Sequence, residues 1–127
     1  MPLKALQHIN IRCTDVEATR EFYSGLLGLT VGPRPPFASF GYWLYAGDIP
    51  VVHIVQRPQG EAAPPAGYGA LDHAAFECDD LEGTKKALRE QSVAFREAVV
   101  PRDGTVQLFV RDPDGVPLEL NFASLSA

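Results

Sequence analysis

The sequence predicts an α+β fold built from two βαβββ modules that are related by a pseudo-twofold axis. Three observations carry this prediction. The 127 residues are enough for one compact domain and too few for two independent ones. Each half has strand-like segments around a single helical segment. A shift of 65 residues superimposes the halves, carrying His8 onto His73 and Cys13 onto Cys78.

The first module is predicted to occupy residues 1–56. Residues 7–12 alternate polar and apolar side chains, as a half-buried strand does. Thr14 and Glu17 form a capping box for a helix that Gly28 can end. The apolar side of this helix consists of Val16, Phe22, Tyr23, Leu26 and Leu27. Strands are expected at 29–32, 39–46 and 50–56, with a proline-rich loop at 33–36.

The second module, residues 70–127, repeats this order after a linker at 57–69 that is rich in Pro, Gly and Ala. Strand-like residues 71–76 precede a second capping box, Asp79 to Glu82, and a helix that ends near Gln91. Further strands are expected at 93–100, 105–111 and 116–122. The last two are joined by Asp112-Pro113-Asp114-Gly115, which suits a type I turn. Residues 1–127 are therefore expected to form a single two-module domain.

Composition and charge exclude several classes of protein. The net charge of −5, with no basic cluster, disfavours nucleic acid as a partner. No apolar run reaches the length of a membrane span, and the first residues lack a signal-peptide pattern, so we expect a cytoplasmic protein that does not bind membranes. Cys13 and Cys78 show no C-x-x-C spacing and are expected to be buried thiols. Neither a Gly-rich phosphate loop nor a G-x-S-x-G motif is present, which disfavours nucleotide-dependent and serine-nucleophile chemistry.

Four side chains that can bind metals occupy repeat-equivalent positions. His8 and His73 are expected in the first strand of each module, and His53 corresponds to Glu119 with a one-residue slip. Their strand neighbours are apolar and should pack under the helices, so these four side chains face the other way. A single strand histidine is usually a packed core or pocket residue, but this does not explain four equivalent positions. Imidazole and carboxylate ligands suit Zn, Ni, Co, Fe or Mn. We therefore predict one divalent transition metal per site in a cavity enclosed by a curved sheet.

Other side chains are candidates for substrate binding. Asn10 and Arg12 share the strand face of His8, and Phe109 and Arg111 share one face of their strand with Gln107. Trp43 is a further candidate, and with Phe37, Phe40, Tyr42 and Tyr68 it lies in or beside loops that could close a pocket. Arg12 and Arg111 could bind a substrate carboxylate through two parallel hydrogen bonds, although most arginines lie on the surface. Core packing or a dimer interface would explain the aromatic residues equally well.

These residues resemble the vicinal oxygen chelate superfamily over essentially the whole chain. The resemblance rests on the paired modules, His8 and His73, Phe22-Tyr23, Leu27-Gly28, and the turn at 112–115 followed by Glu119. The superfamily includes glyoxalase I, methylmalonyl-CoA epimerase, fosfomycin-resistance transferases, extradiol dioxygenases and bleomycin-resistance proteins. The resemblance implies a divalent metal that chelates two neighbouring oxygens of a small substrate and stabilises an enolate-like intermediate.

The resemblance also implies roles for the four residues. His8, His73 and Glu119 match metal ligands that the metal-dependent members share. His53 falls where glyoxalase I has a glutamate ligand, and near an acid-base histidine of extradiol dioxygenases that does not bind the metal. Of these two roles for His53, the sequence favours that of a ligand, because its strand mirrors the strand of Glu119.

Three functions remain open at this stage. The first is an isomerase or lyase of glyoxalase type in which His53 or Glu119 moves a proton at the carbon alpha to a carbonyl. The second is an Fe(II) ring-cleaving dioxygenase, although Phe109 stands where those enzymes generally carry a tyrosine, ten residues before the ligand glutamate. The third is a metal-free binding or resistance protein, which would not need four potential ligands. A homodimer is expected, because the resemblance implies cavities built from modules of two subunits.

Overall fold

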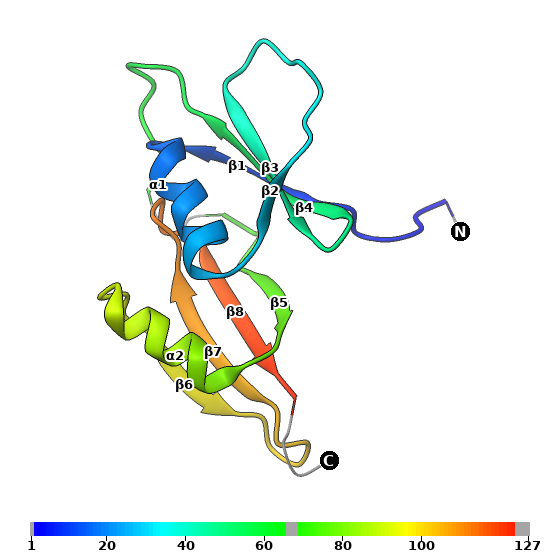
Figure 1. Ribbon diagram of the computed structural model, residues 1–127, viewed down its shortest axis with the longest axis vertical. Coiled ribbons are helices and arrows are strands. Elements are labelled where there is room, and N and C mark those ends of the chain that lie inside the picture. Colours follow the sequence, from blue (N-terminus) through cyan, green and yellow to red (C-terminus); the bar gives the residue numbers. More distant parts are fainter. Residues whose placement is uncertain (1, 66–68, 124–127) are drawn as a thin grey trace. The chain divides into compact units, whose positions relative to one another are not determined.

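The computed structural model describes residues 2–65 and 69–123, and the chain forms two compact units, Met1–Ala63 and Pro64–Ala127. Each unit carries one four-stranded sheet with helix on its apolar face (Figure 1). Within the described residues, no helix is long and apolar enough to cross a membrane. Tyr68, one of the predicted pocket aromatics, lies outside the described residues.

The first unit has the predicted βαβββ order. Its elements are β1 (Ile9–Cys13), α1 (Val16–Arg20), the π-helical segment η1 (Glu21–Leu26), β2 (Thr30–Gly32), β3 (Gly41–Ala46) and β4 (Ile49–Gln56). The strand order is β1-β4-β3-β2, and only the β1–β4 pair is parallel. The helical stretch ends as predicted near Gly28, which adopts a positive φ of 89° that glycine tolerates without strain.

The second unit repeats this topology. Its elements are β5 (Ala74–Cys78), α2 (Leu81–Glu90), β6 (Arg96–Val99), β7 (Val106–Arg111) and β8 (Pro117–Phe122), in the strand order β5-β8-β7-β6. Ile9 stands opposite Val52 in the first sheet, and Ala74 stands opposite Leu118 in the second. This register confirms the 65-residue repeat and the pairing of His53 with Glu119 as equivalent positions. The predicted α+β fold of two repeated modules is confirmed.

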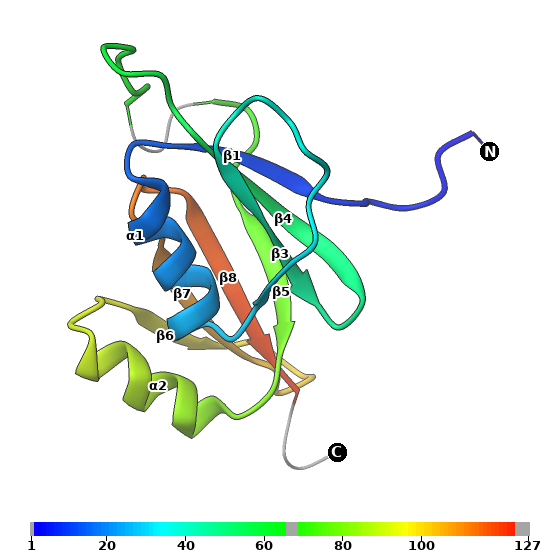
Figure 2. The ribbon, with the colours of Figure 1, turned by 45° about the horizontal axis from the view of Figure 1, so that its top comes forward.

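Alternating strand residues form the core of each unit. In the first sheet Leu44, Val52 and Ile54 are fully buried, and Phe22 and Tyr23 of η1 are buried as predicted. In the second sheet the buried side chains are Leu108, Val110, Leu118, Leu120 and Phe122, together with Leu88 of α2. Both ribbon views place α2 beside its own sheet (Figure 1 and Figure 2). Because side chains alternate along a strand, the residues between these core positions face away from the helices.

The structure corrects several predicted boundaries. Asp15 caps α1, accepting hydrogen bonds from the backbone N–H groups of Glu17 and Ala18, so Thr14 is not the cap. Asp80 likewise replaces Asp79 as the cap of α2. Each helix begins one residue later than predicted. In α1 this is because Asp15 is at least as good a cap as Thr14, and in α2 the Asp80 carboxylate is the one that accepts from the N–H of Gly83.

The opening strands also begin later than predicted. β1 starts at Ile9 and β5 at Ala74, so His8 and His73 each directly precede a strand instead of lying in it. The strand predicted at 93–100 is shorter, Arg96–Val99. Of the two predicted buried thiols, Cys13 is buried and Cys78 is half-buried, and neither forms a disulfide.

Candidate metal and substrate site

The first unit brings two of the four predicted metal ligands together. His8 precedes β1, His53 lies on the neighbouring strand β4, and their rings stack with centroids 3.7 Å apart and planes 11° apart. Trp43, which stands opposite His53 on β3, stacks on the same ring at 4.1 Å. The His53 ring is therefore held between its neighbours on both adjoining strands.

Hydrogen bonding determines which nitrogen of His53 carries a proton. Nε2 lies 3.0 Å from the carbonyl oxygen of Pro50, and a carbonyl oxygen can only accept, so Nε2 carries the hydrogen in this arrangement. The lone pair of the neutral ring is then on Nδ1. Burial lowers the pKa of His53, the nearby charges of His8 and Arg34 lower it further, and the hydrogen bond to the Pro50 carbonyl opposes them. The net shift favours a neutral imidazole whose lone pair lies on Nδ1.

The second unit brings the other two predicted ligands together. Nε2 of His73 lies 3.0 Å from Oε2 of Glu119. The other carboxylate oxygen, Oε1, accepts a hydrogen bond of 2.5 Å from Nε2 of Gln107. The Glu119 side chain is only 15% exposed, which makes such partners necessary for a carboxylate. Gln107 also donates to Asn121, so the three polar side chains form one network on the face opposite the core.

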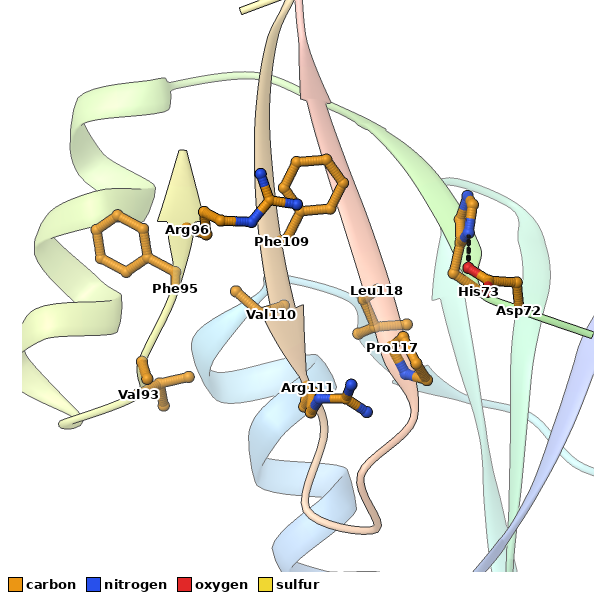
Figure 3. Close-up of a pocket in the computed structure, with 11 residues that line it drawn as sticks. Asp72, His73, Val93, Phe95, Arg96, Phe109, Val110, Arg111, Pro117 and Leu118 are labelled. Atoms are coloured by element: carbon orange, nitrogen blue, oxygen red, sulfur yellow. Dashed lines mark hydrogen bonds and ion pairs between the residues drawn. The ribbon is translucent and has the colours of Figure 1, made fainter. Parts of the chain in front are cut away.

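The residue before each histidine binds its Nδ1 nitrogen. Oδ1 of Asp72 lies 2.8 Å from Nδ1 of His73 (Figure 3), and Oε1 of Gln7 lies 3.0 Å from Nδ1 of His8. The hydrogen bond that Nδ1 of His73 donates to Asp72 raises the pKa of His73, burial opposes it, and the charges of Glu119 and Asp72 add to the increase. With Nδ1 occupied, Nε2 is the nitrogen of each ring that is left for a metal, and in His73 this nitrogen faces Glu119.

Gln7 and Asp72 are two further candidate site residues that strand alternation alone does not indicate. The signal was available, because the same 65-residue shift that relates the histidines also relates the acceptors before them.

The donor atoms fit a divalent metal. Nε2 of His73 and Oε2 of Glu119 lie 3.0 Å apart in an ion-pair contact, and imidazole nitrogen and carboxylate oxygen are both ligand types that divalent transition metals accept. Among the described residues, His, Cys, Asp and Glu form no metal-binding group of three or more. Each unit by itself therefore brings together one pair of the predicted ligands.

Some of the predicted substrate-binding side chains already have partners within the chain, and others do not. Arg12 is in ion-pair contact with Glu61 at 2.6 Å, so its guanidinium already has a carboxylate partner. Asn10 is exposed and stands opposite His53. Among the aromatic residues, the ring centroids of Phe37 and Trp43 lie 6.3 Å apart, and those of Phe40 and Tyr42 lie 5.7 Å apart. The Tyr42 hydroxyl donates a hydrogen bond to Glu17.

A pocket of about 640 Å³ lies in the second unit, next to His73 (Figure 3). Its walls contain two of the predicted substrate-binding residues, Phe109 and Arg111. The other residues that line it are Asp72, His73, Val93, Ala94, Phe95, Arg96, Val110, Pro117 and Leu118. Sequence analysis overlooked Arg96, whose guanidinium lies over the Phe109 ring at 4.2 Å. Only the pairing of β6 with β7 brings these two residues together.

The sequence profile of the Glyoxalase/Bleomycin resistance protein/Dioxygenase superfamily matches residues 5–120 of the chain. The chain belongs to this superfamily. The match includes both histidine-headed modules and extends one residue beyond Glu119, so it covers all four predicted ligands.

Relatives within the glyoxalase superfamily include enzymes. Glyoxylase I 4 of Arabidopsis thaliana is 31% identical over 93% of this chain and 70% of its own length. The mitochondrial methylmalonyl-CoA epimerase of Bos taurus is 26% identical over 95% of this chain and 75% of its own length. Among solved structures, the glyoxalase family protein from Enterococcus faecalis is 30% identical, with a TM-score of 0.70 over 95% of this chain and 99% of that protein.

Proposed function

We propose that this chain is a divalent-metal-dependent enzyme of glyoxalase type, a lyase or isomerase that acts on a small substrate with two neighbouring oxygen atoms. The observation that carries the proposal is the pairing of His8 with His53 and of His73 with Glu119, on the face of each sheet opposite the core. Membership of the glyoxalase superfamily supports it.

Three residues hold the metal in this proposal. His8 and His73 bind through Nε2, because Gln7 and Asp72 occupy their Nδ1 atoms. Glu119 binds through the carboxylate oxygen that faces His73, while Gln107 fixes its other oxygen. A divalent metal bound there supplies a Lewis acid that polarises a substrate carbonyl.

His53 is proposed to move the proton. Its Nε2 is bound to the Pro50 carbonyl, so we assign the catalytic role to Nδ1, which takes the proton from the carbon alpha to the carbonyl and later returns it. The lowered pKa of His53 keeps the ring neutral and able to accept this proton. This assignment departs from the ligand role that the sequence favours: the bond to Pro50 leaves Nδ1 as the nitrogen with a lone pair, and we assign that nitrogen to proton transfer instead of to the metal.

Metal content and proton exchange together test the proposal. Protein purified without chelator should contain about one transition metal per chain, and His8→Ala and Glu119→Ala should each lose most of it. His53→Gln should keep the metal, while its turnover falls by roughly 10²–10⁴. Turnover is measured by NMR as deuterium incorporation from heavy water at the alpha carbon of hydroxyacetone and related hydroxycarbonyl compounds.

Three results would contradict parts of the proposal. If His8→Ala and Glu119→Ala retained the metal content of the parent, the ligand assignment would be wrong. Loss of metal from His53→Gln would return His53 to the ligand set. Bound Fe(II) together with a requirement for oxygen would replace the lyase or isomerase with a ring-cleaving dioxygenase.

A further inference from the structure

The pocket beside His73 lies at one end of the second sheet. β5, β6 and β8 begin at this end and β7 finishes there, so the pocket is lined by residues from four chain segments. Phe95, Phe109 and Pro117 give it apolar walls, and Arg96 and Arg111 place two positive charges at its rim.

Both guanidinium groups are held in place by contacts that do not neutralise them. Arg96 lies over the face of Phe109, 4.2 Å from the ring centroid, which is a favourable cation–π geometry. Nη1 of Arg111 donates to the carbonyl oxygen of Gly115 at 3.0 Å. That carbonyl belongs to the predicted type I turn, in which the N–H of Gly115 donates to the carbonyl of Asp112. Each arginine therefore keeps N–H groups for a ligand.

The charge balance around the pocket favours an anion. Among the described residues, Arg12, Arg20, Arg57, Lys85 and Lys86 are in ion-pair contact with carboxylates, whereas Lys4, Arg34, Arg89, Arg96, Arg102 and Arg111 are not. Of these six, only Arg96 and Arg111 line the pocket. Asp72, the acidic residue in the pocket wall, is bound to His73, and so is Glu119.

The sheet register connects the arginines to the proposed metal ligands. Arg96 stands opposite Phe109, and Phe109 stands opposite Glu119 on the next strand. Strands are about 4.8 Å apart, so Arg96 and Glu119 are separated by about 10 Å of backbone with the Phe109 ring between them. In the next row, Arg111 stands opposite Pro117. A molecule that spans about 10 Å along this row of residues would reach both the proposed ligand pair and an arginine.

We propose that this pocket is an oxyanion subsite, in which Arg96 and Arg111 bind a carboxylate or phosphate group of the substrate and Phe109 contacts its carbon skeleton. The substrate is then a small organic anion whose chelating oxygens lie at the other end. The substrate assignment rests on the proposed function, whereas binding of an oxyanion to the pocket does not require the metal. Planar guanidinium groups suit both oxyanions, because they donate two parallel hydrogen bonds.

Ligand titration of the full chain after removal of metal by a chelator tests the subsite separately from the metal site. The probes are benzoate, phenyl phosphate and neutral benzamide, and binding is followed by calorimetry and by ¹H–¹⁵N NMR. At least one of the two anions should bind about tenfold or more tightly than benzamide, since hydrogen bonds to charged groups have this magnitude. The tighter anion identifies the class of group, and higher salt should weaken its binding.

Variants locate the binding. Arg96→Gln and Arg111→Gln should each weaken binding of the tighter anion about tenfold. Arg102→Gln is the matched control, because it removes the same charge from the loop at the opposite end of the β6–β7 hairpin and should leave affinity unchanged. Equal binding of anions and benzamide, no binding of either anion at millimolar concentration, or equal losses in all three variants would each overturn the proposal. A metal-free parent that binds the anion while His8→Ala still holds metal would support the subsite and contradict only the proposed metal site.

Discussion

Replacement of Asp72 by alanine should weaken metal binding about tenfold, although Asp72 is not itself a proposed ligand. Its carboxylate accepts the Nδ1 hydrogen of His73 at 2.8 Å and so fixes the tautomer that presents Nε2. Removing such a partner from a metal-binding histidine costs about 10- to 100-fold in affinity. The Asp72 side chain is 92% exposed, so solvent screens its charge and the lower end of this range applies.

The assay is competition for zinc against a chromophoric chelator in mildly alkaline buffer. The hydrogen bond that His73 donates to Asp72 raises the pKa of His73, so in acidic buffer a proton would compete with the metal for Nε2. Alkaline buffer removes this competition and leaves the effect on ligand geometry. ¹⁵N chemical shifts of the His73 ring report the tautomer in the metal-free protein.

Two matched variants refine the test. Asp72→Asn keeps an oxygen acceptor without the charge and should lose less affinity than Asp72→Ala. Gln7→Ala removes the equivalent neutral acceptor from His8 and should also have the smaller effect. If Asp72→Ala bound zinc as tightly as the parent and kept the same tautomer, while His73→Ala lost zinc, the reasoning about Asp72 would be refuted.

Two further predictions concern assembly and stability. The chain should be a homodimer whose sites combine His8 and His53 of one protomer with His73 and Glu119 of its partner. Mixing inactive His8→Ala and Glu119→Ala protomers should then restore activity, because one site of each mixed dimer has all four residues. A monomeric mass by light scattering would contradict this prediction. Asp112→Ala should lower the free energy of unfolding in urea by about 3 kcal/mol, because the buried carboxylate accepts hydrogen bonds from the N–H groups of Asp114 and Val116. Asp112→Asn keeps the acceptor and should lose about half as much, and equal losses in the two variants would count against the charged hydrogen bonds.

The sequence determined the repeated topology and the two pairs of candidate ligands. Alternation along a strand assigns each side chain to one face, and the 65-residue repeat assigns equivalent positions, so His53 and Glu119 could be matched before any contact was known. The turn at 112–115 could be predicted for a similar reason, because Pro and Gly have backbone preferences that act locally. Local sequence patterns were sufficient to predict the register of a strand wherever one face of that strand is buried.

Only the tertiary structure decided how these side chains are used. The bond from His53 to the Pro50 carbonyl depends on the rotamer of the ring, which its stacking neighbours constrain. Glu61, 49 residues away in the sequence, accepts a hydrogen bond from the Arg12 guanidinium. The pairing of β6 with β7 places the Arg96 guanidinium over the Phe109 ring. Such contacts depend on the register and rotamers of segments far apart in the sequence, and a one-residue change in register would turn each of these side chains to the opposite face. The sequence could therefore name the candidate ligands, but not the atoms through which they act.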